Sequence, residues 1–72
     1  MRRKKFPYSQ MDYLIGEYVT GYKAERNRKI LREHFLDGFT HEEIAEHFGM
    51  SSVQVGRIIR NHGDPLLLMI EK

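Results

Sequence analysis

The sequence predicts an all-α domain of four or five short helices, and three observations support this prediction. Apolar residues recur at steps of three and four along most of the chain, which is the spacing of one helix face. Ser, Thr or Asp precede these segments and glycines follow them, as at the ends of many helices. The 72 residues are enough for one domain with one small core.

The first expected helix follows a basic segment. Ser9 is placed to cap it, with Asp12 three residues later to return the hydrogen bond, and Gly21 is expected to end it. Its expected buried face consists of Met11, Leu14, Ile15, Tyr18, Val19 and Tyr22. We therefore divide the chain into a basic N-terminal arm at residues 1–8 and a single domain at residues 9–72.

The second expected helix is highly charged and runs from Lys23 to Asp37, where Gly38 ends it. Its expected apolar face consists of Ala24, Leu31 and Phe35, flanked by Ile30. Its basic residues are Lys23, Arg26, Arg28, Lys29 and Arg32. Two interpretations of these residues stay open, namely contacts to phosphates and ordinary solvation.

Two shorter helices are expected next. Thr40 and Glu43 match a capping box, and Gly49 is expected to end the helix that they start. Ser51 is expected to cap the following helix, which Gly63 ends. The apolar faces of the two helices are Ile44, Ala45 and Phe48, and Val55, Ile58, Ile59 and His62.

The C-terminal segment is the most apolar part of the chain. Asp64 and Pro65 match a cap followed by a first-turn proline, which predicts a last helix at residues 66–71, with a short strand as the alternative. Its apolar residues are Leu66, Leu67, Leu68, Met69 and Ile70. They either complete the core or form the contact of a homodimer, and we favour the homodimer.

Composition excludes several classes of function. The chain has no cysteine, and its four histidines lack the spacing of a zinc site, so no metal or other cofactor is expected. His41 and His62 are instead expected to be partly buried and bonded to the backbone. No glycine-rich phosphate loop or nucleophile motif is present, so no enzyme is expected. The longest apolar run is too short to cross a membrane, which favours a cytoplasmic protein without membrane contact.

Charge is distributed unevenly along the chain. Residues 1–32 contain nine Lys or Arg and three Asp or Glu, whereas residues 33–72 contain three and seven. Within that acidic half, residues 51–62 contain Arg57 and Arg60 and no carboxylate. Local positive charge of this kind favours phosphate binding.

Residues 40–60 resemble the bacterial helix-turn-helix signature, on the basis of Ile44, Ala45, Gly49, Val55 and Ile58. Together with the preceding helix, residues 24–62 resemble the last DNA-binding region of sigma factors and small Trp-repressor-like regulators. This resemblance implies a central trihelical helix-turn-helix, with the motif at residues 40–61.

The resemblance also implies a sequence-specific DNA-binding transcriptional regulator, in which a recognition helix at about residues 51–61 enters the major groove of double-stranded DNA. The residues expected to read bases are Ser52, Val53 (a thymine methyl), Gln54 (adenine) and Arg57 (guanine). Those expected to contact phosphates are Thr40, Ser51, Arg60, Asn61, Arg2, Arg3, Lys4 and Lys5.

Other interpretations of the motif stay open. A sigma-like module that binds RNA polymerase or another protein is the alternative function, and plain solvation would also explain the polar residues after Ser51. Glu42, Glu43 and Glu46 are expected to point sideways or away from DNA. Gly56 costs its helix about 1 kcal/mol relative to alanine; it either permits a close approach or is simply tolerated.

Overall fold

A computed structural model describes residues 7–70 of the protein, and all of its regular structure in that range is helical. The elements are α1 (Tyr8–Tyr18), α2 (Ala24–Phe35), α3 (His41–Phe48), α4 (Ser52–Ile58), the π-helical turn η1 (Ile59–Gly63) and α5 (Asp64–Ile70). The all-α prediction is confirmed. No helix within the described range is long and apolar enough to cross a membrane.

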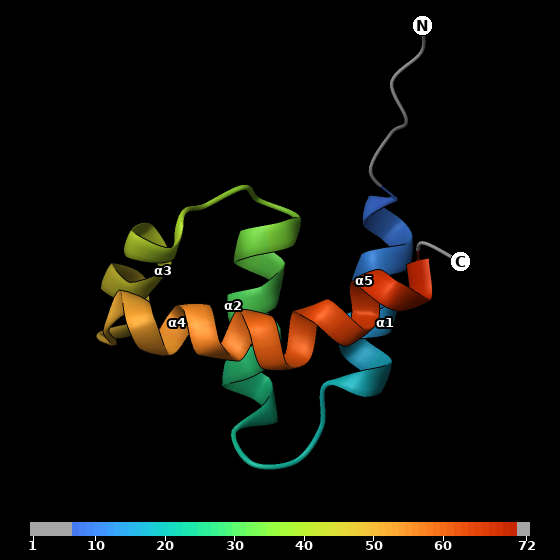
Figure 1. Ribbon diagram of the computed structural model, residues 1–72, viewed down its shortest axis with the longest axis horizontal. Helices are drawn as coiled ribbons and strands as arrows, with labels where there is room; N and C mark the ends of the chain where they lie inside the picture. Colours follow the sequence, from blue (N-terminus) through green and yellow to red (C-terminus); the bar gives the residue numbers. More distant parts are fainter. Residues whose placement is uncertain (1–6, 71–72) are drawn as a thin grey trace, which may run out of the picture.

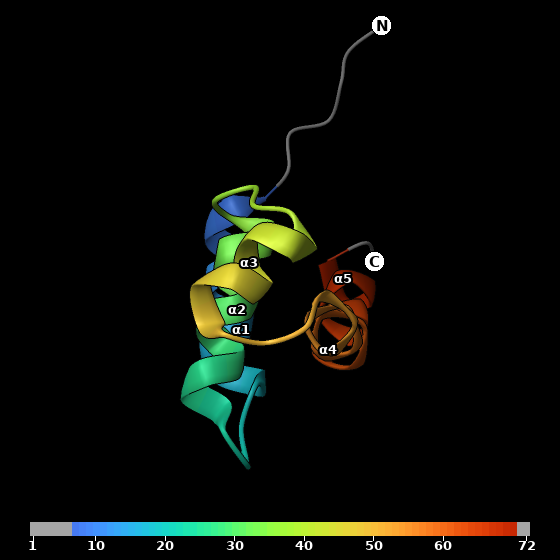
Figure 2. The same ribbon diagram turned by 90° about the vertical axis from the view of Figure 1, so that its left-hand side faces the viewer.

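The helices form two layers. Figure 1 shows α4, η1 and α5 following one another as a single rod that crosses α2 and α1. In Figure 2 this rod is seen end-on, on one side of the layer that α1, α2 and α3 form. The rod contacts α3 and α2 near its beginning and α1 near its end, so its two ends face different parts of the fold.

One core lies between the two layers. It consists of Met11, Leu14, Ile15, Val19, Ile30, Leu31, Ile44, Ala45, Val55, Ile59 and Leu66. Leu66 brings α5 into the core and is as buried as the residues of α1 and α2. The described part of the C-terminal segment is therefore a helix that completes the core at Leu66, while Leu68 and Met69 of the same helix stay exposed.

The start of α1 differs from the expectation. Pro7 occupies the N-cap position without a side-chain hydrogen bond, so the prediction of a Ser9 cap is wrong. Asp12 accepts a hydrogen bond from Arg32 of α2 at 2.7 Å instead of returning one to Ser9. Tyr18 and Tyr22, which were expected on the buried face, are exposed, because α1 ends at Tyr18 and the chain turns away.

Helix α2 is shorter than its charge pattern predicted. Lys23 has a left-handed backbone with a φ of 55° before the helix, and Leu36 caps its other end. Gly21 and Gly38 have positive φ as expected, but they lie in the loops rather than directly at the helix ends. Asn27 is buried in α2, where the Arg26 guanidinium donates to its Oδ1. Ala24 and Phe35 are only partly buried, whereas Ile30 is fully buried.

The prediction that Gly63 ends the helix after Ser51 is wrong. Asp64 has right-handed helical dihedrals, so the chain continues from η1 into α5 without a cap between them. Pro65 lies in the first turn of α5, where its missing N–H interrupts the normal hydrogen-bond ladder. The π-helical turn directly before it is a form in which helices accommodate such an interruption.

Candidate nucleic-acid interface

The turn between α3 and α4 is fixed by local hydrogen bonds. The Thr40 hydroxyl accepts from the Glu43 backbone N–H at 3.1 Å, and the Glu43 carboxylate accepts from the Thr40 N–H at 2.9 Å. Gly49 then ends α3 with a φ of 64°, a left-handed conformation that favours glycine. The predicted capping box and the predicted turn glycine are both present.

Helix α4 begins with a second capping box, which the sequence analysis missed. The Ser51 hydroxyl accepts from the Gln54 N–H at 3.1 Å, and Gln54 Oε1 accepts from the Ser51 N–H at 3.2 Å. The spacing Ser-x-x-Gln was a sufficient signal for this reciprocal pair. In this arrangement Gln54 stabilises the start of α4.

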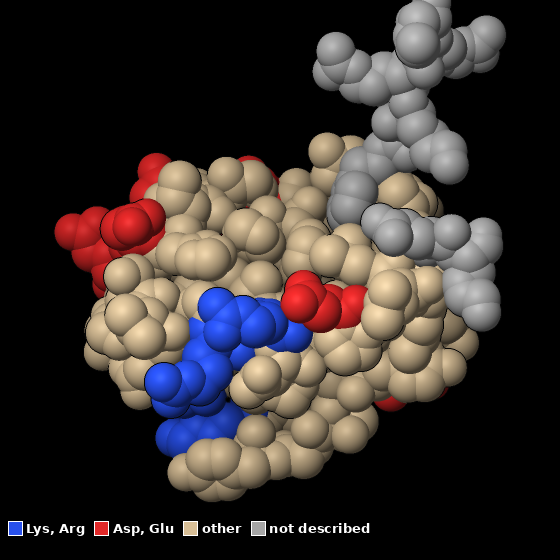
Figure 3. Space-filling model, in the orientation of Figure 1, with Lys and Arg blue, Asp and Glu red and all other residues tan. Residues whose placement is uncertain are grey.

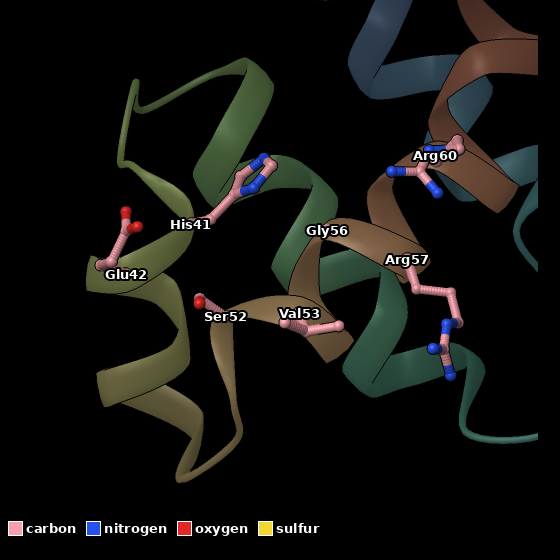
Figure 4. A pocket seen from close by; sticks show the side chains of 7 residues that line it. All are labelled: His41, Glu42, Ser52, Val53, Gly56, Arg57 and Arg60. Atoms are coloured by element: carbon pink, nitrogen blue, oxygen red, sulfur yellow. The ribbon is translucent and has the colours of Figure 1, made fainter.

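The outer face of α4 borders an open groove of about 300 Å³ (Figure 4). Val55 and Ile59 hold the opposite face of the rod in the core. The groove is lined by His41, Glu42, Ser52, Val53, Gly56, Arg57 and Arg60. The structure thus brings together three of the four expected base-reading residues, Ser52, Val53 and Arg57.

The residues that line the groove differ in part from those that the sequence predicted. Gln54 and Asn61 are exposed but do not line it, whereas Arg60, expected to hold a phosphate, does. Glu42 and His41 of α3 form part of its wall; Glu42 was expected to point sideways or away from DNA, and His41 is partly buried as expected but also borders the groove. Their places at the start of α3, next to the predicted Thr40 cap, were the available signal.

His41 is packed directly over Gly56. A Cβ atom at position 56 would lie 3.4 Å from His41 Nδ1 and 3.6 Å from Cε1, which is ordinary van der Waals contact. The other neighbour of this ring is His34 of α2, with ring centroids 5.2 Å apart. His41 therefore lies next to Gly56 without requiring a glycine there, and both alternatives for Gly56 stay open. The other histidine expected in the core, His62, has Asn27 Nδ2 3.5 Å from its Nε2.

The arginines divide into two groups. Arg26, Arg28 and Arg32 of α2 donate hydrogen bonds to Asn27 Oδ1, the Val19 carbonyl and Asp12 Oδ1, respectively. Within residues 7–70, Arg57 and Arg60 have no hydrogen-bond or ion-pair partner. Figure 3 shows basic side chains in a band across this face, acidic ones gathered over α3, and a further acidic group next to one end of the band. The guanidinium groups at the groove are therefore free to bind a ligand.

One titratable pair joins α2 to α3. His47 Nδ1 lies 2.8 Å from Glu33 Oε1, and this hydrogen bond raises the pKa of His47. The carboxylates of Glu33, Glu43 and Glu46 act in the same direction. In the part of the chain that the structure describes, no three histidine or carboxylate side chains are placed to hold a metal ion.

A protein-family model described as "Sigma-70, region 4" matches residues 24–60, which is half of the chain. The chain belongs to the sigma-70 region 4 family. It is thus a helix-turn-helix domain of a DNA-binding family. No characterised protein and no solved structure gave a significant match.

The sigma-70 region 4 match covers α2, the whole helix-turn-helix and the first two residues of η1. It therefore includes all seven residues that line the groove. The match does not extend to α1 and α5, which pack against each other at the other end of the rod. The sigma-like part of this chain is thus the part that bears the groove.

Proposed function

We propose that this protein is a sequence-specific DNA-binding transcriptional regulator whose helix α4 enters the major groove of double-stranded DNA. The observation that carries the proposal is the pair of guanidinium groups of Arg57 and Arg60, which have no partner within residues 7–70 and lie beside Ser52 and Val53 at the groove. In helix-turn-helix proteins the second helix of the motif carries the base-reading side chains. We therefore propose that this protein binds DNA and does not catalyse a reaction.

Each base-reading residue has a preferred partner in the major groove. Arg57 can donate two parallel hydrogen bonds to guanine O6 and N7, and Ser52 can bond to several bases. Gln54 can pair with adenine N6 and N7, but its Oε1 must then leave the Ser51 N–H. We therefore expect Arg57 to contribute more to specificity than Gln54, whose release from the cap carries a cost.

Residues next to the proposed base-reading residues of α4 are placed to contact phosphates. Arg60, Asn61, Ser51 and Thr40 are the proposed phosphate-binding residues of the described range. Both hydroxyls accept a capping bond; Thr40 keeps a proton to donate to a phosphate oxygen, whereas the Ser51 hydroxyl donates to Gln54 Oε1 at 3.5 Å and must turn from it to reach a phosphate. Glu42 opposes these contacts, because its carboxylate lines the same groove.

The four basic residues of the arm, Arg2, Arg3, Lys4 and Lys5, lie outside the described residues. We propose that they add phosphate contacts that do not depend on sequence. Replacing all four by glutamine is expected to weaken binding to every duplex equally and to flatten the dependence of log K on log salt concentration. If the salt dependence of the glutamine variant were unchanged, the arm would not contact the DNA phosphates.

Selection of bound sites from random duplex DNA tests the proposed function. Arg57→Ala is expected to cost about 1 to 3 kcal/mol on the selected site and to relax the preference at one base pair. Arg57→Lys is the matched control, because it keeps the charge and loses the fork that reads guanine. Failure to enrich any sequence would overturn the proposal. An equal loss of affinity for all sequences in Arg57→Ala would show that Arg57 contacts a phosphate instead of a base.

A second candidate function is binding to another protein, either RNA polymerase or a second copy of this chain. The exposed side chains of Leu68 (67%) and Met69 (39%) on α5 favour it. Light scattering at high concentration tests the homodimer, since a clean monomer would exclude it. The selected DNA gives an independent check, because a dimer across two half-sites predicts a palindrome and a monomer an asymmetric site.

A further inference from the structure

Val53 is an apolar residue on an otherwise polar reading face. Its side chain is 68% exposed and lines the groove between Ser52 and Arg57. Single exposed valines are common and need no explanation by themselves. The surroundings of Val53 make this one informative.

The space next to Val53 is kept open by the absence of a side chain. Gly56 lies one turn after Val53, so both residues share the groove face of α4. The imidazole of His41 bounds this space from α3, since it would lie 3.4 Å from a Cβ at position 56. Val53, Gly56 and His41 line one part of this largely polar groove, and the exposed methyl groups of Val53 are its apolar contribution; we call this part the Val53 recess (Figure 4).

The cations beside the recess indicate what approaches it. Arg57 and Arg60 line the same groove and have no partner within residues 7–70. Their charge complements the phosphates and the acceptor atoms of guanine. The duplex edge that they attract contains one kind of apolar group in its major groove, the methyl at C5 of a pyrimidine.

We propose that the Val53 recess binds the 5-methyl group of a pyrimidine, supplied either by thymine or by 5-methylcytosine. This inference rests on the proposed function, because it requires α4 to enter the major groove. Removing one methyl from water into such a contact corresponds to about four-fold in affinity. DNA binding by this chain then responds to cytosine methylation wherever a cytosine occupies that position.

The test uses the full chain and the duplex obtained by selection. Each thymine is replaced in turn by deoxyuridine, which lacks only the methyl. Wild type is expected to lose about four-fold in affinity at one position. For Val53→Ala, the ratio of the affinities for the thymine and the uracil duplexes (the thymine-to-uracil ratio) is expected to be near one at that position. Tyr13→Ala is the matched control, because Tyr13 is similarly exposed (64%) but lies on α1. It is expected to keep the wild-type ratio.

A second pair of duplexes separates the two sources of the methyl. Cytosine and 5-methylcytosine are placed at the sensitive position, and wild type is expected to bind the methylated duplex about four-fold more tightly. Val53→Ala is expected to bind both equally. Gly56→Ala, which places a methyl in the recess, is expected to reduce both ratios.

The outcomes distinguish the recess from the function. If wild type binds its site but no thymine methyl affects affinity, the proposal that the Val53 recess binds a methyl group is wrong, whereas the proposed function is unaffected. The same holds if Val53→Ala keeps the full thymine-to-uracil ratio. If no DNA sequence is selected at all, both the proposed function and the methyl contact are wrong. Circular dichroism of each variant establishes that it is folded, and Val53→Ser, which also lacks both methyl groups of the valine, replaces Val53→Ala if alanine prevents folding.

Discussion

Gly63 of η1 lies against the ring of Phe35 in α2, so closely that a Cβ at position 63 would be 2.9 Å from Phe35 Cε2 and 3.0 Å from Cζ. This contact lies where the rod of α4, η1 and α5 crosses α2 (Figure 1). Gly63 is buried and helical, and its backbone does not require glycine. Its function is therefore to let the rod approach the ring.

Gly63→Ala is expected to destabilise the fold by about 1 to 3 kcal/mol, because the added methyl overlaps Phe35. In an open helix the same substitution would stabilise by about 1 kcal/mol. The free energy of unfolding in urea measures the sign directly. A variant at least as stable as wild type would contradict the contact.

Phe35→Leu provides the control for this substitution. Leucine removes the ring atoms nearest to Gly63, so Gly63→Ala is expected to cost less in that background than in wild type. A double-mutant cycle isolates this interaction.

The capping box of α3 predicts a difference between two substitutions at Thr40. Thr40→Ala removes the acceptor for the Glu43 N–H and is expected to cost about 1 kcal/mol of unfolding free energy. Thr40→Ser keeps the hydroxyl and is expected to retain most of it. Equal losses for the two variants would show that the hydroxyl is not what stabilises the helix start.

The two leucines Leu66 and Leu68 of α5 are expected to behave differently. Leu66 is buried in the core, so Leu66→Ala is expected to cost about 2 to 5 kcal/mol. Leu68 is exposed, and Leu68→Ala is expected to change stability by about 0.5 kcal/mol or less. Chemical unfolding of a dilute monomer measures both. A large loss for Leu68→Ala in the monomer would place that residue in a packed contact within the fold.

The pair of His47 and Glu33 makes stability depend on pH. Because the pKa of His47 is raised above 6.5, the pair stabilises the folded state fully below that pH. The contribution is lost as the pH rises through the folded pKa of His47. The difference in unfolding free energy between wild type and His47→Gln is therefore expected to shrink as the pH rises.

Nuclear magnetic resonance titration tests the cause of this dependence. Glu33→Gln removes the carboxylate that contacts Nδ1 and is expected to lower the pKa of His47. An unchanged pKa of His47 in Glu33→Gln would mean that its shift has another origin.

Local interactions explain which predictions from sequence succeeded. The Thr40–Glu43 box and the Gly49 turn are formed by residues within one helical turn of each other, so their spacing is visible in the sequence. The Ser51–Gln54 box was equally visible and was overlooked. Local rules also misled: Ser9 has the right residue type for a cap, but α1 begins one residue before it.

Residue spacing along the chain was enough to predict the helical class, the helix-turn-helix and the exposed face of its second helix, because periodicity and caps join residues at most four positions apart. The packing of the two layers was needed to show that Gly63 lies inside a continuous rod, that His41 lies next to Gly56, and that Arg32 pairs with Asp12 while Arg57 and Arg60 have no partner within residues 7–70. Those outcomes depend on side chains 15 to 28 positions apart, which meet only when the layers pack. No local pattern encodes such distances.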